Sequence, residues 1–82
     1  MHEYGLVGEL LLRVDQIARE HGAARVLRVQ VKLGALSGVE PYLFRTAYET
    51  FRERTVCADA PLTLADASGD ELLLERVELE VP

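Results

Sequence analysis

Cysteine, long apolar runs and clustered basic residues are all scarce in this sequence. The 82 residues include one cysteine, Cys57, so the chain cannot close an internal disulfide, and such usage fits a reducing compartment. No run approaches the roughly 18 apolar residues of a membrane span, and no basic segment followed by an apolar stretch opens the chain. We therefore expect a cytoplasmic protein with no membrane association.

The charge balance narrows the class of partner. The formal net charge is −5, and no cluster of Lys and Arg occurs. A nucleic-acid backbone is disfavoured as a partner because the electrostatic term would be repulsive. Cations, or a protein with a basic face, suit this chain better.

Local catalytic motifs are missing as well. Ser37 does not lie in a nucleophile-elbow pattern, and the glycines of 34–38 are not followed by the Lys-Ser/Thr pair of a phosphate loop. Acidic pairs such as Glu78 and Glu80 are expected on a solvated face. The sequence predicts a protein that is not an enzyme.

The length and the apolar content indicate one small domain over 1–82. The apolar fraction of 49% is typical of a globular protein. A core of this size is marginal, and small domains often depend on a metal or a partner subunit.

Two segments have helical periodicity. Apolar residues recur at helical spacing from Leu6 to Ile17, and we predict a helix over 4–21 that Gly22 ends. Pro41 fits the first turn of a second helix. Its apolar stripe consists of Leu43, Phe44, Ala47, Tyr48 and Phe51.

Three segments have strand character. The segment 25–33 alternates strictly, 61–65 is a short strand, and 71–81 is a longer one. Turn residues at 66–70 predict that the second and third strands form a hairpin. The residues expected to face inward are Leu27, Val29, Val31, Leu33, Val77, Leu79 and Val81. The residues expected to face water are Arg28, Gln30, Lys32, Glu78 and Glu80.

The alternation of the third strand slips at Glu75 and Arg76, which predicts a β-bulge or a part covered on both faces. The order helix, strand, helix, strand, strand predicts an α+β fold. We expect a small three-stranded mixed sheet with both helices packed on one face.

The first three residues, Met1, His2 and Glu3, could form a metal site. A terminal amine, backbone amide nitrogens and the His2 imidazole can surround a metal in one plane, which favours nickel(II) or copper(II), and Glu3 adds an oxygen. The alternative is that these residues occur together by chance and that Glu3 complements the helix dipole.

Cys57 and His21 are candidates for structural roles. A single thiol cannot build a thiolate site, so Cys57 is expected to be a small apolar residue in the loop before the second strand. His21 suits the negative end of the first helix.

Four blocks of sequence, in this order, carry a family resemblance. They are Met1-His2-Glu3-Tyr4, His21-Gly22-Ala23-Ala24-Arg25-Val26, Gly34-Ala35-Leu36-Ser37-Gly38-Val39-Glu40-Pro41 and Ser68-Gly69-Asp70-Glu71-Leu72. Over nearly the whole chain, the sequence resembles HypA/HybF, the nickel metallochaperone of nickel-iron hydrogenase maturation. The third block is the most specific of the four.

The resemblance implies a function, partners and site residues. It implies delivery of nickel(II) to the hydrogenase large subunit, with a HypB-like GTPase as partner, and to urease in some organisms. His2 matches the family's nickel-binding histidine and Glu3 the acidic residue beside it. Glu40 matches an acidic position near the nickel region, so it is a secondary candidate for metal or partner contact.

One departure from the family is large. Members resembling this chain carry a zinc module with two Cys-x-x-Cys pairs between the second and third strands, where this sequence has the turn 66–70. One cysteine cannot supply such a site, so we expect no zinc in this chain.

Two hypotheses follow. The first is a metallochaperone domain without zinc, which binds one nickel(II) at its N-terminus and passes it on. The second is an interaction or scaffold module that kept the fold and lost metal transfer. Exposed edge strands would also permit a homodimer by strand pairing or exchange.

Overall fold

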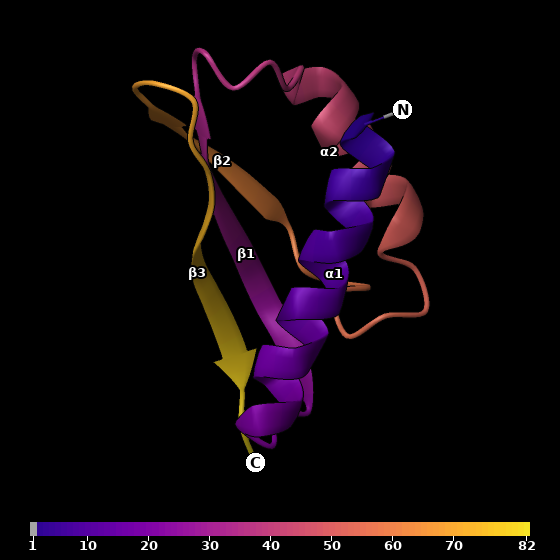
Figure 1. Ribbon diagram of the computed structural model, residues 1–82. Coiled ribbons are helices and arrows are strands. Elements are labelled where there is room, and N and C mark those ends of the chain that lie inside the picture. Colours follow the sequence, from indigo (N-terminus) through magenta and orange to yellow (C-terminus); the bar gives the residue numbers. More distant parts are fainter. Residues whose placement is uncertain (1) are drawn as a thin grey trace.

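The computed structural model describes residues 2–82 and confirms an α+β fold. Its elements are α1 (His2–Glu20), β1 (Arg25–Gly34), α2 (Pro41–Phe51), β2 (Leu62–Ala67) and β3 (Leu72–Glu80). The sheet has the order β2-β1-β3, with β2 parallel and β3 antiparallel to β1. Both helices cover one face of this mixed sheet, as expected (Figure 1).

The amphipathic pattern of α1 sets which face of the helix is buried. Glu3, Val7, Leu11, Val14 and Ala18 follow one another at helical spacing and are all buried. Beyond the last turn the chain adopts a positive φ of 61° at Gly22, and the Ala23 N–H donates to the Ala18 carbonyl at 2.9 Å. This left-handed glycine ends the helix as the sequence predicted.

The core lies between the helices and the inner face of the sheet. The Tyr48 hydroxyl, which is fully buried, donates to the Ala60 carbonyl at 2.9 Å, and the guanidinium of Arg52 donates to the same oxygen at 2.8 Å. The main core residues are Val7, Val14, Val26, Val29, Val31, Phe44, Ala47, Tyr48, Cys57 and Ala60. Among residues 2–82, no helix has the length and apolar character needed to cross a membrane.

The inner face of β1 differs from the expected one at its start. Leu27 was expected to face inward, but it is 41% exposed, whereas Val26 is buried. The cause is a register shift: Val26 pairs with Leu79 and Arg28 with Glu78, which leaves Leu27 without a partner on β3. A bulge at Leu27 therefore reverses the alternation that a regular strand would keep.

The bulge predicted in β3 is confirmed at Glu75. Gln30 pairs with Arg76 and Val31 with Leu74, so Glu75 is the extra residue. Its carboxylate accepts a hydrogen bond from Gln30 Nε2 at 2.6 Å and lies 3.3 Å from the Lys32 ammonium. The bulge thus turns an acidic side chain onto the face of the sheet that the helices leave open.

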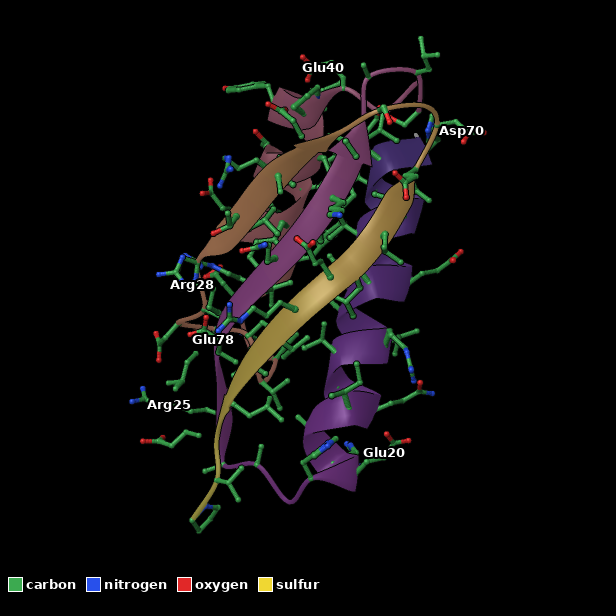
Figure 2. The ribbon with its side chains drawn as sticks, turned by 90° about the vertical axis from the view of Figure 1, so that its left-hand side faces the viewer. Glu20, Arg25, Arg28, Glu40, Asp70 and Glu78 are labelled. Carbon is green, nitrogen blue, oxygen red and sulfur yellow. The ribbon has the colours of Figure 1, made fainter. Side chains whose placement is uncertain are left out.

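Other charged side chains populate this open face, which Figure 2 views from the front with the helices behind. Arg28 donates to the Thr63 hydroxyl at 3.0 Å and lies 3.9 Å from the Glu78 carboxylate. Arg25 pairs with Glu80 at 2.7 Å. These exposed pairs contribute about 0–1 kcal/mol each, so they chiefly keep this face polar. Val81, expected to face inward, lies beyond β3 and is 57% exposed.

The predicted hairpin of the second and third strands is wrong. β2 and β3 lie on opposite sides of β1, and α2 is the crossover that makes β1 and β2 parallel. Asp66 and Ala67, predicted in the turn, belong to β2. The connection 68–71 must therefore cross the end of the central strand.

Gly34 is the residue at which this crossing takes place. Its N–H donates to the Glu71 carbonyl at 2.7 Å, and the Leu36 N–H donates to the Gly69 carbonyl at 2.7 Å. A Cβ at position 34 would lie 2.4 Å from the Gly69 carbonyl oxygen and 2.8 Å from the Glu71 nitrogen. Both atoms belong to the backbone, so only glycine fits without displacing the connection.

We predict that Gly34→Ala lowers the free energy of unfolding by about 1–3 kcal/mol, the range for overpacking against atoms that cannot move aside. The matched control is Gly8→Ala in α1, where a Cβ meets nothing within 4 Å. That change should raise the free energy of unfolding by roughly 0.5–1 kcal/mol, because alanine is the better helix former. Urea unfolding of the three proteins measures both effects. Equal stability of Gly34→Ala and the unchanged protein would contradict the crossing.

Candidate functional site

Glu3 is a buried acid at the start of α1. Its side chain is 7% exposed, and among residues 2–82 it is the one buried charged residue. Position 3 lies one turn before Val7 on the buried stripe of the helix, which explains why an acidic side chain turns inward here. A carboxylate in such a place needs hydrogen-bond donors.

The donor for Glu3 comes from a segment far away in the sequence. The backbone N–H of Glu40 donates to Oε2 of Glu3 at 3.2 Å. This bond, followed by one from the N–H of Glu3 itself, holds the pKa of the Glu3 carboxyl below its ordinary value, against the opposing effect of desolvation. The contact joins the starts of α1 and α2, which lie side by side (Figure 1).

Glu40 has a second task in the same place. Its backbone is extended, with φ −86° and ψ 117°, and its Oε2 accepts the N–H of Leu43 at 2.8 Å. Glu40 is therefore the N-cap of α2, and Pro41 follows in the first turn, where its missing N–H costs no hydrogen bond. The structure thus brings Glu3 and Glu40 together.

The loop before Glu40 explains the most specific block of the sequence. Gly38 has a positive φ of 77°. The Ser37 hydroxyl accepts the Val39 N–H at 3.2 Å, and the Ser37 N–H donates to the Gly34 carbonyl at 3.1 Å. These contacts aim the N–H of Glu40 at Glu3. The sequence block 34–41 therefore holds the hydrogen-bond donor of Glu3 in position.

An aromatic pair is the second contact that holds the first turn of α1 against α2. The rings of Tyr4 and Phe51 meet edge to face, with centroids 5.1 Å apart and an interplanar angle of 67°. Tyr4 and Glu3 are adjacent, so α2 contacts the first turn of α1 through two neighbouring side chains. Neither the Glu3–Glu40 contact nor the Tyr4–Phe51 contact was predicted from the sequence, although an acid on the apolar stripe of the helix was a signal for the first.

His2 stands at the beginning of this fixed turn. It is the first residue of α1 and its side chain is exposed. The N–H groups of the first turn of a helix have no intrahelical acceptor, so they are available to a ligand. The arrangement offers an imidazole and free backbone nitrogens at one accessible point. Met1, the third residue of the candidate site, lies outside the described residues.

Acidic, thiol and imidazole side chains do not form a preformed metal cage in the described part of the chain. No group of three or more His, Cys, Asp or Glu side chains within residues 2–82 could hold a metal ion.

The two other candidates lie elsewhere. Nδ1 of His21 lies 2.8 Å from the Ile17 carbonyl, so it closes the end of α1 as expected. Cys57 is completely buried, and burial raises the pKa of its thiol. It is the apolar loop residue that the sequence predicted.

The family comparison bears directly on this end of the molecule. A family model described as hydrogenase/urease nickel incorporation, metallochaperone, hypA matches residues 1–72, which include His2, Glu3 and the whole loop to Glu40. The chain belongs to the HypA family. HypA proteins are nickel metallochaperones of hydrogenase and urease maturation, so this member is a maturation factor and not an enzyme.

Curated HypA relatives are similar along most of the chain. The hydrogenase maturation factor HypA of Shewanella oneidensis is 40% identical over 93% of this chain and 72% of its own length. That of Aquifex aeolicus is 45% identical over 78% of this chain and 56% of its own. The hydrogenase/urease maturation factor HypA of Helicobacter pylori is 40% identical, over 98% of this chain and 62% of its own. The chain thus spans about half to three quarters of these HypA proteins.

Solved HypA structures have the same fold. The solution structure of the Ni metallochaperone HypA from Helicobacter pylori matches with a TM-score of 0.89 at 24% identity, over 98% of both chains. A second solution structure of a HypA protein matches with a TM-score of 0.71 at 32% identity, over 93% of this chain and 71% of the other.

We predict that Glu3→Ala speeds hydrogen exchange at the Glu40 amide, because that N–H loses its acceptor. Glu3→Gln, which keeps an oxygen there, should have a smaller effect.

The same contact should depend on pH, because the pKa of Glu3 is lowered in the folded state. The contact stabilises the fold at pH values above the ordinary pKa of 4.5, and this contribution is lost as the pH falls through the folded-state pKa. Exchange measured by NMR on metal-free protein tests the contact. Unchanged exchange in Glu3→Ala would contradict it.

We also predict that Cys57 resists alkylation in the folded protein. Burial and the raised pKa both lower the amount of accessible thiolate, which is the reactive form. Iodoacetamide labelling followed by mass spectrometry should be slow in buffer and should reach the rate of a free cysteine in denaturant. Rapid labelling of the native protein would show that this thiol is open to a metal or a partner.

Proposed function

We propose that this HypA-family protein carries one nickel(II) ion at Met1, His2 and Glu3 and passes it to the large subunit of a nickel-iron hydrogenase, with a HypB-like GTPase as partner. The observation that carries the proposal is the exposed His2 on a first helical turn that Glu3 and Glu40 hold in place. The membership in the HypA family agrees with nickel as the cargo.

The chemistry of the proposed site follows from its donors. The terminal amine of Met1, the amide nitrogen of His2 and the His2 imidazole are the nitrogen set that favours nickel(II) in a planar arrangement. The amide nitrogen binds the metal after its proton is released to solvent. This set exists only if Met1 is the first residue of the mature protein. The amide is available because no intrahelical hydrogen bond uses it.

Glu3 has two roles in this proposal, one for each carboxylate oxygen. Its Oε2 accepts the Glu40 N–H, which supports a role in positioning the turn that carries His2. Its Oε1 is the oxygen that we assign to the cargo. Glu40 then acts mainly by fixing Glu3, with its own carboxylate committed in part to the cap of α2.

We further propose that nickel transfer proceeds here without zinc. The single thiol, Cys57, is buried in the core and lies outside the connection 68–71, where the resembling family carries its cysteine pairs. That connection is instead a short crossing closed by backbone hydrogen bonds to β1 and the residues after it. Recombinant protein should accordingly contain no stoichiometric zinc.

Nickel titration by calorimetry tests the site. Protein whose Met1 terminus is verified by mass spectrometry should bind one nickel ion, and His2→Ala should abolish this uptake because the chelate loses its imidazole. The matched control is His21→Ala, which removes the other histidine of the chain. A residue added before Met1 should also abolish uptake, since it removes the terminal amine.

Two outcomes would overturn the proposal. Unchanged nickel uptake in His2→Ala would place the metal elsewhere. No uptake by the unmodified protein, together with stoichiometric copurification of another protein, would favour a scaffold module that has lost metal transfer.

A further inference from the structure

Lys and Arg side chains are scarce at one end of this molecule. The nine Lys and Arg residues are absent from three stretches, 1–12, 33–44 and 55–75. Parts of these stretches meet at the end that carries the proposed nickel site. The Glu40 N–H donates to Glu3, and the N–H of Leu36 donates to the Gly69 carbonyl.

The acidic side chains at this end have no basic side chain paired with them. Glu40, Asp66, Asp70 and Glu71 form no ion pair within residues 2–82, a property that they share with Glu9, Glu20, Glu49, Glu53 and Asp59. Figure 2 shows Glu40 and Asp70 near one end of the molecule and Glu20 near the other, with Arg25 in the half away from Glu40. Because the stretches that meet at the first end contain no Lys or Arg, its acids are not neutralised by basic side chains from those stretches.

Apolar surface lies exposed among these acids. Leu36 is 77% exposed and Tyr42 is 71% exposed, although both are large side chains. Beside them is a pocket of about 240 Å³ between the ends of β1 and β2 and the loop that leads into α2. Its lining includes Leu33, Val39, Pro41, Leu64 and, as its one charged member, Asp66.

We propose that this acidic and apolar end docks a segment of the nickel-receiving partner in which an apolar side chain is flanked by Lys or Arg. The apolar side chain fills the pocket, and the basic residues pair with Asp66 and Asp70. The inference deepens the proposed function and rests on it for the identity of the partner. It adds the surface and the chemistry of the segment that the surface recognises.

The negative charge of this end favours a basic partner segment over a second copy of the chain, an anionic membrane or a nucleic acid. A second copy of the chain, related by two-fold symmetry, would bring the same unpaired acids against themselves, and like charges across an interface oppose association. An anionic membrane or nucleic acid would be repelled in the same way. A basic partner segment gains attraction and places its own ligands beside the cargo.

The test compares two double variants in binding to the nickel-receiving partner of the proposed function, the purified hydrogenase large subunit of the same organism. Asp66→Lys with Asp70→Lys reverses charge at the proposed surface. The control, Glu20→Lys with Glu53→Lys, makes the same change in net charge at exposed positions elsewhere. The first should weaken binding to the large subunit at least about tenfold, and the control should leave it within about twofold.

A second pair of variants probes the apolar part. Leu36→Ser should weaken the same complex, whereas Leu12→Ser, an equally drastic change at a side chain 69% exposed on α1, should not. Binding of the unchanged protein should also weaken as salt is raised, and that dependence should be smaller for the charge-reversed variant. Thermal unfolding of each variant checks that the fold is kept.

Nickel titration of the same variants separates this inference from the proposed function. The docking variants should still take up nickel, because His2 and Glu3 are intact. If the unchanged protein does not take up nickel as proposed, but Asp66→Lys/Asp70→Lys selectively loses partner binding, the proposed function alone is overturned. Three results would overturn the docking surface. They are equal losses in the test and control variants, unchanged binding of the test variant, and no binding of the large subunit to the unchanged protein.

Discussion

The crossing of the connection 68–71 over Gly34 is the constraint on which the rest of this structure depends. β1 is the central strand because it pairs with β2 on one side, in parallel, and with β3 on the other side, antiparallel. The crossover helix α2 connects β1 to β2. The chain that leaves β2 must then pass the end of β1 to reach β3. It passes with backbone atoms that a Cβ at Gly34 would touch at 2.4 Å, so the absence of a side chain there permits this strand order.

The same crossing supports the proposed nickel site. Backbone hydrogen bonds to the connection hold Gly34 and Leu36 in place, and the Ala35 N–H donates to the carbonyl of Ala67 at the end of β2. From there the positive φ of Gly38 and the cap at Glu40 direct one N–H toward Glu3. The glycine-containing segment 34–40 therefore links the central strand to the first turn of α1 through consecutive contacts.

The local sequence pattern predicted features that depend on residues close together in the chain. It did not predict features that depend on which strands pair and in what register. The slip of alternation at Glu75 was visible because a bulge changes parity within one strand. The bulge at Leu27 was not visible, since Val26 and Leu27 are both apolar and the register with β3 decides between them. The hairpin was wrong for the same reason, because turn residues at 66–70 fit a tight turn and a short crossing equally well. The contact of Glu3 with Glu40 spans 37 positions, beyond the reach of periodicity.

The start of a helix is a physically suitable place for a cargo that must be released. Its first N–H groups lack intrahelical acceptors, so a metal can use main-chain nitrogen there without breaking the helix. The positive end of the helix dipole opposes a cation at the same point, by roughly the 0.3–1 kcal/mol typical of such interactions. Glu3 and Glu40 supply negative charge that offsets this opposition, and Glu3 is anchored by a hydrogen bond. An ion at His2 would thus be attracted by nearby carboxylates yet remain exposed to solvent and to a competing set of ligands.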